Sequence, residues 1–331
     1  MVDRSMVYNI IYALAAKDGR EKALFGDSAP HAITAFEHSL AGSGFPELWF
    51  EIPLTGEPWF DLHVLTESKD AEPGMAFSPE MCGGNPKVFE WFAAQKGAVR
   101  QLALSWDTGS GDSSTPAVQL LVSGPDPQVT CDFLAVAGRL DAMAAYRAFR
   151  DRLPAGWFAC YTGTFPARPK HNLRVECIPG HDLQQAYAND ASLLAEHLKQ
   201  VGLQDLGDTL VPRCQELART PFHIEFQFDV DERGYADTTF GASLRFAAPP
   251  GDGEWRPFDP DGEAGELMRR IEEWGLADGR WRPLADTAYA TRVARGGHSA
   301  LLYCYPAFVK LRWRKASPLD AKAYIIAGVD A

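Results

Sequence analysis

The sequence predicts an α+β fold in which strand pairs alternate with helices around one closed antiparallel barrel of ten strands. Three observations lead to this prediction. Five pairs of strand-like segments recur along the 331 residues, each pair joined by a turn or loop. Helix-like stretches separate the pairs. Within the strands, apolar and polar residues alternate, which is typical of a sheet whose two faces meet different surroundings.

The first strand pair shows the pattern most clearly. ELWFEIPL and WFDLHVLT are joined by TGEP, in which Gly56 and Pro58 favour a turn. The other pairs are VRQLALSWD with AVQLLVSG, GWFACYTGTF with HNLRVECIP, PFHIEFQFDVD with ADTTFGASLRF, and SALLYCYPAFVKLRWR with AKAYIIAGV. Five hairpins can close into a ten-stranded barrel wrapped by an outer ring of helices. The same segments also fit one or two open sheets covered by helices.

Helical periodicity fills the gaps between the hairpins. We expect an N-terminal helix over about 1–24 and five helix–hairpin units over about 30–331, together a single barrel domain. HAITAFEHSLAGSG ends at glycine, and NPKVFEWFAAQKG begins with Asn85 as a candidate N-cap. The later helical stretches are DPQVTCDFLAVAGRLDAMAAYRAFRDRLP, DLQQAYANDASLLAEHLKQVG, LGDTLVPRCQELART and DGEAGELMRRIEEWG.

Composition and charge exclude several classes of protein. The chain is 46% hydrophobic and 23% charged, which is ordinary for a globular protein. A net charge of -12 and a pI of about 5.1 provide no broad basic surface for nucleic acid or acidic lipid. No apolar run approaches the roughly 20 residues that span a bilayer, and no secretory signal is present. We therefore expect a cytoplasmic protein whose six scattered cysteines are reduced. The oligomeric state stays open.

The polar face of the predicted strands carries a mixture of charges and aromatic rings. In the first strand Phe50 and Ile52 face one way, and Trp49 and Glu51 face the other. The same polar face carries Trp59, Asp61, His63, Arg174, Glu176, His223, Glu225, Asp229, Lys310, Arg312, Lys322 and Tyr324. A solvated face usually carries fewer tryptophans, whereas aromatic rings interleaved with charges suit a ligand cavity. A sheet with one wet face shows the same alternation.

The segment FVKLRWRKA, residues 308–316, has a basic residue at every second position. The alternation predicts that Val309, Leu311 and Trp313 pack on helices. Lys310 and Arg312 then point to the opposite face, which is the interior if the sheet closes. Arg314 and Lys315 are expected at the rim, near the turn.

The order helix, strand, strand, helix, repeated over most of the chain from about His31, resembles the soluble aromatic prenyltransferases of the ABBA or PT-barrel fold. In that family ten strands surround a central lumen. Basic residues hold the diphosphate of an allylic donor, and tyrosines shield the carbocation. An acidic residue on an early strand orients or deprotonates the aromatic acceptor. The resemblance implies prenyl transfer to an indole- or phenol-like acceptor, in a small molecule or a peptide.

The resemblance also implies roles for individual residues. Glu51, in LWFEI, would hold the acceptor and take its proton. The diphosphate would be bound by Arg174, Arg245, Lys310, Arg312 and Lys322. The cation shield and acceptor pocket would comprise Trp49, Trp59, His63, His223, Glu225 and Tyr324. In metal-independent members basic residues stand in for magnesium, so no cofactor is implied and Mg²⁺ is possible but not required.

Acidic residues on the same face favour an alternative. Asp61, Glu176, Glu225 and Asp229 would repel a diphosphate unless paired or bridged by a metal. The alternative is a barrel-shaped binding protein, or a non-prenyl enzyme, for a small zwitterionic or peptidic ligand. The pairs Asp61/His63 and His223/Glu225 each project to one side and fit either a divalent ion or a simple His–carboxylate hydrogen bond. The pairing of the cations in the folded chain distinguishes these possibilities.

Overall fold

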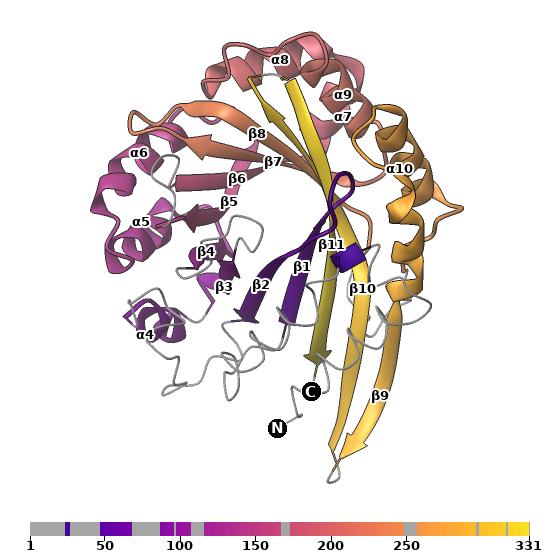
Figure 1. Cartoon of the computed structure of the whole chain (residues 1–331). Coiled ribbons are helices and arrows are strands. Elements are labelled where there is room, and N and C mark those ends of the chain that lie inside the picture. The colour runs from indigo at the N-terminus through magenta and orange to yellow at the C-terminus, as the bar shows by residue number, and fades with distance from the viewer. Residues whose placement is uncertain are drawn as a thin grey trace.

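Ten antiparallel strands close into a ring in this computed structural model. The structure describes residues 24–26, 47–67, 87–95, 97–106, 116–166, 173–247, 257–295, 298–315 and 317–330. The strand order around the ring is β11-β1-β2-β3-β4-β5-β6-β7-β8-β10, and β10 pairs with β11 to complete it. Figure 1 looks along the ring and shows the helices on its outside. The predicted closed barrel with an outer helical layer is confirmed.

The strands match the five predicted hairpins. Their bounds are β1 Glu47–Pro53, β2 Asp61–Glu67, β3 Val99–Trp106, β4 Ala117–Val122, β5 Trp157–Thr164, β6 Leu173–Pro179, β7 His223–Val230, β8 Ala236–Arg245, β10 His298–Arg314 and β11 Ser317–Asp330. An eleventh strand, β9 (Tyr289–Arg295), is an addition to the prediction. It pairs with the first part of β10, from His298 to Cys304, whereas β8 pairs with the last part, from Phe308 to Arg314. β9 therefore extends the sheet beyond the ring (Figure 1).

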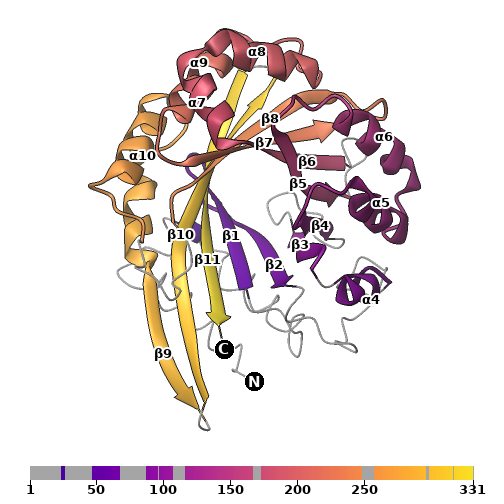
Figure 2. The ribbon, with the colours of Figure 1, turned by 180° about the vertical axis from the view of Figure 1, so that it is seen from behind.

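The helices cover the outside of the ring, as the views from both sides show (Figures 1 and 2). Their bounds are α4 Lys87–Ala94, α5 Pro127–Val136, α6 Leu140–Arg150, α7 His181–Asn189, α8 Ala191–Gln200, α9 Leu210–Ala218, α10 Glu263–Glu273 and the 3-10 helix η3 Gly279–Thr287. The helix expected over 1–24, apart from Leu24, and the stretch HAITAFEHSLAGSG lie outside the described residues. In the described part of the chain, every helix is too short or too polar to cross a membrane.

Two helical stretches of the sequence are each divided into two helices. Between α5 and α6 the backbone turns at Gly138, whose φ of +73° suits glycine. Between α7 and α8, the Asp190 carboxylate accepts hydrogen bonds from the backbone N–H groups of Ser192 and Leu193, at 2.9 and 3.2 Å. Asp190 is thus the N-cap of α8 and starts a new helix there.

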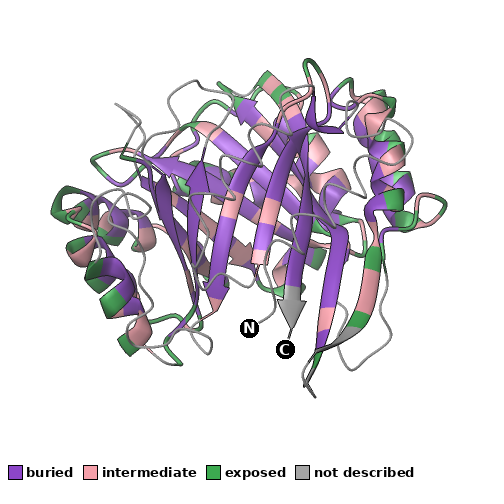
Figure 3. Cartoon of the chain, turned by 60° about the horizontal axis from the view of Figure 1, so that its bottom comes forward, coloured by how far each residue is buried: buried purple, intermediate pink, exposed green. Residues whose placement is uncertain are grey.

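The main hydrophobic core lies between the sheet and the helices. Phe226 and Phe228 of β7, Phe240 of β8 and Trp313 of β10 are fully buried and in ring contact with their neighbours. The predicted outward direction of Val309, Leu311 and Trp313 is confirmed, since all three belong to this core. Figure 3 shows the consequence: strands are buried around the ring, while helices expose their outer surfaces. The opposite face of each strand points to the barrel interior.

The turn between β7 and β8 depends on a glycine. Gly234 has a φ of +75°, and a Cβ there would lie 2.6 Å from Ala148 Cβ and 2.7 Å from Ala145 O on α6. Gly56 has a φ of +76°, but nothing lies within 4 Å of its Cβ position. Both alanine substitutions bear the left-handed strain of about 1–3 kcal/mol. Gly234→Ala adds a steric clash and should cost about 1–3 kcal/mol more than Gly56→Ala in urea denaturation. Equal losses of unfolding free energy in the two variants would show that α6 shifts far enough to remove the clash.

Candidate active site

The inner face of three strands brings together an acid, two lysines and an aromatic wall. Strand register places Glu51 of β1 opposite Tyr324 of β11, and Tyr324 opposite Phe308 of β10. One step along the same ladder, Lys310 lies opposite Lys322. β1 is the first described strand in the sequence and β10 and β11 are the last two, so barrel closure creates this site.

Glu51 is buried and held by positive charge. Lys322 Nζ lies 2.9 Å from Glu51 Oε1 and 3.3 Å from Asp61 Oδ2. His63 Nε2 lies 3.1 Å from Glu51 Oε2. Burial by itself raises the pKa of Glu51, but the charges of Lys322 and Lys310 and the His63 hydrogen bond hold it well below its usual range. Glu51 is therefore a carboxylate whose oxygens already have partners.

A chain of hydrogen bonds runs from Glu51 through β2 to β4. Ser105 Oγ lies 2.6 Å from His63 Nδ1, and the Gln119 side-chain amide donates to Ser105 Oγ. Because the Glu51 carboxylate can only accept, His63 carries a hydrogen on Nε2 and donates it to Glu51. In the neutral ring Nδ1 is then an acceptor, to which the Ser105 hydroxyl donates while it accepts from Gln119. Ser105 and Gln119 were not predicted as site residues, although alternation on β3 and β4 places them inward.

Aromatic rings line the interior beside the two lysines. Tyr324 stacks on Phe308 with 4.0 Å between ring centroids, and Trp49 meets Phe308 edge-on at 5.3 Å. Lys310 Nζ donates to the Tyr324 hydroxyl at 2.7 Å and lies 4.9 Å from the ring centroid. Lys322 Nζ lies 4.5 Å from the Trp59 ring centroid. Tyr324 and Trp59 thus each lie against one lysine, Trp49 packs on Phe308 and Tyr324, and the role of these rings as a cation shield stays a prediction.

Three of the five predicted diphosphate ligands share one region of the interior, and each has a carboxylate partner. Besides the two Lys322 contacts, Arg174 Nε donates to Asp229 at 2.8 Å, and Lys310 Nζ lies 3.9 Å from Glu176. Burial lowers the pKa of Lys310; the carboxylates Glu51 and Glu176 oppose this effect, and the positive charges of Arg174 and Lys322 add to it. The pKa of Lys310 therefore depends on the other two interior cations.

The other two predicted ligands, Arg312 and Arg245, have different contacts. Arg312, the next inward residue of β10 after Lys310, forms a two-point ion pair with Asp320 on β11, and the charge of Glu51 also acts on it. Arg245 is exposed, and its guanidinium lies 5.5 Å from the Phe308 ring centroid. Both residues lie on the inner face, as alternation predicted, and their role as diphosphate ligands stays a prediction.

Glu225, on β7, has no hydrogen bond or ion pair within the described part of the chain. Burial raises its pKa to about 7, and Glu176 adds to this effect, while Arg245 and Lys310 oppose it. His223, two residues earlier, has its pKa lowered by burial and by His181. These two residues were assigned to the acceptor pocket from the sequence, and they lie on the inner face near the exposed Arg245.

A further inner-face carboxylate, the half-buried Glu47 of β1, was not predicted from the sequence. It accepts hydrogen bonds from Trp49 Nε1, from the Tyr303 hydroxyl at 2.9 Å and from Gln101 Nε2 at 3.5 Å. Burial raises its pKa. Glu47 is the first residue of β1, four positions before Glu51, and therefore points inward as Glu51 does. This alternation is the sequence signal that could have identified it. Among the described residues, no three His, Cys, Asp or Glu side chains gather into a metal site.

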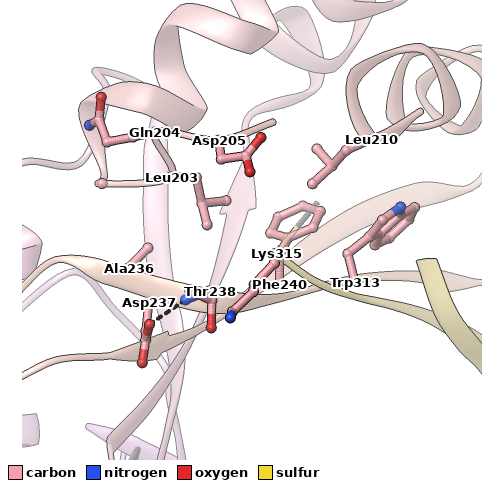
Figure 4. Close-up of a pocket in the computed structure, with 11 residues that line it drawn as sticks. Leu203, Gln204, Asp205, Leu210, Ala236, Asp237, Thr238, Phe240, Trp313 and Lys315 are labelled. Atoms are coloured by element: carbon pink, nitrogen blue, oxygen red, sulfur yellow. Dashed lines mark hydrogen bonds between the residues drawn. The ribbon is translucent and has the colours of Figure 1, made fainter. Parts of the chain in front are cut away.

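A pocket of about 370 Å³ lies on the other face of the sheet (Figure 4). It is enclosed by the connection between α8 and α9 and by the ends of β8 and β10. Phe240 and Trp313 line it, and both belong to the core that faces the helices. The pocket is therefore separate from Glu51 and the interior cations.

No protein-family model matches this chain, and no curated protein is similar in sequence. Several solved structures are similar at low identity, and three of them serve as examples. Prenyltransferase PriB, solved with L-tryptophan and dimethylallyl thiolodiphosphate, is 13% identical; the match covers 98% of this chain and 95% of PriB, with a TM-score of 0.48. The 6-dimethylallyltryptophan synthase from Micromonospora olivasterospora, solved with DMASPP and Trp, is 15% identical; the match covers 97% of this chain and 95% of the synthase, with a TM-score of 0.49. AnaPT from Neosartorya fischeri is 11% identical; the match covers 98% of this chain and 91% of AnaPT, with a TM-score of 0.45. Sequence identities and TM-scores this low say nothing about the activity of this chain. By its own strand order, the closed barrel of this chain resembles the PT-barrel or ABBA fold of the soluble aromatic prenyltransferases.

Proposed function

We propose that this barrel is an aromatic prenyltransferase, which moves a prenyl group from an allylic diphosphate to an indole- or phenol-like acceptor in its interior. One observation supports this above others: an ionised carboxylate, buried lysines and an aromatic wall are in contact inside a closed barrel. Lys322 contacts Glu51 at 2.9 Å, and Lys310 contacts Tyr324 at 2.7 Å. These are the chemical groups that the two halves of the reaction require.

The donor half of the proposal uses the interior cations. Loss of diphosphate from an allylic carbon leaves negative charge on oxygen, and cations placed at that charge lower the barrier. Arg174, Lys310 and Lys322 are the candidates. The allylic cation left behind is stabilised over an aromatic face, for which Trp49 and Tyr324 are available. We propose that these cations make a metal dispensable, so that Mg²⁺ is an optional companion of the diphosphate.

The acceptor half uses Glu51. The charges of Lys322 and Lys310 keep it ionised, and the hydrogen-bond chain through His63 and Ser105 orients it. A carboxylate of this kind accepts a hydrogen bond from an indole N–H or a phenol O–H and fixes the ring against the aromatic wall. We assign Glu51 to orientation of the acceptor, with Trp49 and Phe308 as the ring contacts.

A specific observation favours a second function. Each of the three interior cations already has a carboxylate partner, in the pairs Arg174–Asp229, Lys310–Glu176 and Lys322–Glu51. A diphosphate has to approach these carboxylates, which opposes its binding. A zwitterionic or peptidic ligand supplies both charges and can exchange with the existing pairs. The second candidate is therefore a binding barrel, or a non-prenyl enzyme, for such a ligand.

Calorimetry with non-hydrolysable donors separates the two functions. We expect dimethylallyl or geranyl thiodiphosphate to bind and to raise the melting temperature, with unchanged affinity in EDTA. Lys310→Met should weaken this binding at least tenfold, because it removes one charge from the cation cluster. The control Lys199→Met, on the exposed surface of α8, should bind as the wild type does. No heat and no thermal shift with either donor, together with binding of an aromatic zwitterion, would establish the second function instead.

A further inference from the structure

Glu225 differs from the other inner-face carboxylates of the described strands. Glu47, Glu51, Asp61, Glu176, Asp229 and Asp320 each accept a hydrogen bond or form an ion pair. Glu225 does neither within the described residues, and it is only partly exposed. A carboxylate kept out of water without a partner costs free energy. Such a group in a native interior calls for a functional explanation.

Glu51 is poorly suited to remove a proton. Its oxygens accept from Lys322 and His63, and its pKa is held well below the usual range. Protonation of Glu51 breaks its ion pair with Lys322, and each unit of lowered pKa makes that proton about 1.36 kcal/mol harder to hold. Glu51 can therefore orient an acceptor, but a reaction that ends with loss of a ring proton needs another base.

Glu225 stands across Lys310 from Glu51. Strand register places Glu225 opposite Ser243 of β8, and Ser243 opposite Lys310 of β10. The charge of Lys310 acts on both Glu51 and Glu225, so the two carboxylates flank the same lysine. This places Glu225 on the inner face, on the opposite side of Lys310 from the carboxylate that orients the acceptor.

The charges around Glu225 leave it able to gain and lose a proton near neutrality. The groups that face it are Glu176 from β6, Arg245 from β8, Lys310 from β10, Cys160 from β5 and His223 on its own strand. Glu176 opposes ionisation of Glu225, while Arg245 and Lys310 favour it; burial prevails and brings the pKa to about 7. A base is most effective when its pKa lies near the working pH.

We infer that Glu225, and not Glu51, is the base that takes the ring proton in the proposed prenyl transfer. The inference rests on that proposed function. The bond between the prenyl C1 and the diphosphate oxygen breaks, and the diphosphate leaves with the electron pair. A ring carbon of the acceptor forms the new bond to C1 and becomes positively charged. The Glu225 carboxylate then removes the proton from that carbon, the ring becomes aromatic again, and the proton passes to water.

Glu225→Gln tests the inference through the pH profile and an isotope effect. In the wild type, kcat should rise with pH through about pH 7 as Glu225 loses its proton. In Glu225→Gln, kcat should fall by about 10²–10⁴-fold and lose this acidic limb. Deuterium at the prenylated ring position should slow the variant at every pH and the wild type on its acidic limb, because proton removal limits the rate wherever the Glu225 carboxylate is missing. Glu225→Asp should restore part of the rate and the limb. The control Glu232→Gln, on the exposed β7–β8 turn, should leave rate and profile unchanged.

The possible failures are distinguishable. If the wild type transfers no prenyl group, the proposed function is wrong. If it does, and Glu225→Gln keeps the acidic limb and shows no isotope effect, the inference is overturned while the proposed function stands. If the limb disappears in Glu51→Gln and persists in Glu225→Gln, Glu51 is the base. Melting temperatures of Glu225→Gln and Glu225→Asp close to that of the wild type verify that both variants are folded.

Discussion

Lys322→Met should lower the free energy of unfolding at pH 7 by about 3–5 kcal/mol, although methionine fills a similar volume. Lys322 is 3% exposed, and its ammonium group contacts both Glu51 and Asp61. Removal of the ammonium leaves two buried carboxylates without their cation. Loss of one member of a buried ion pair costs about this much, because the remaining charge loses its nearest cation and is not solvated in its place.

Urea denaturation over a range of pH checks this result and its cause. The folded-state pKa of Glu51 is lowered from 4.5, so its contribution to stability is complete above that pH and is lost as the pH falls further. The difference between Lys322→Met and the wild type should therefore shrink below about pH 4.5. The control Lys199→Met should change stability by at most about 0.5 kcal/mol. A loss below 1 kcal/mol at pH 7 in Lys322→Met would mean that water or other side chains compensate the carboxylates.

Glu51→Gln should weaken binding of the aromatic acceptor by roughly 10–150-fold, which corresponds to about 1.5–3 kcal/mol for a hydrogen bond to a charged group. Glutamine has the same shape and still accepts from Lys322, but it is uncharged. Lys322 keeps Asp61 as its partner, so the barrel should stay folded. The dissociation constant of the acceptor, measured by calorimetry with thiodiphosphate present, reports the effect.

Two further measurements make the Glu51 prediction specific. The affinity for the thiodiphosphate alone should stay within a few-fold of the wild type, and Glu232→Gln should bind acceptor normally. A variant that loses donor affinity while it keeps acceptor affinity would assign Glu51 to the electrostatics of the cation cluster. It would then have no role in orienting the acceptor.

The fold could be predicted because it depends on local patterns. Period-two alternation assigned a face to each strand, and turn residues such as Gly56 marked the hairpins. Gly138 indicates a break between α5 and α6, but the sequence analysis treated the two as one helical stretch. β9 was missed because its short run of small and charged residues pairs with only part of a long neighbour, and no local pattern shows how far β10 extends past the ring.

The sequence predicted which site residues point into the barrel, but not which cation pairs with which carboxylate. Alternation placed Glu51, Lys310, Lys322 and Tyr324 inward, and the structure brings them together. Which cation meets which carboxylate depends on register across strands distant in sequence, and on bulges such as the one between Pro306 and Phe308. The unpartnered state of Glu225 is a property of the whole interior, so no stretch of sequence contains it.

The pairing of β1 with β11 makes the order of synthesis important for this protein. Each of the five hairpins can form as soon as its two strands have left the ribosome, since both strands are close in sequence. The ring cannot close until β11 emerges, which at roughly 5–20 residues per second is tens of seconds after β1. During that time the free edge of β1 can pair with another nascent chain. Synthesis slowed at any point between β1 and β11 should therefore increase aggregation, because the edge of β1 stays unpaired for longer.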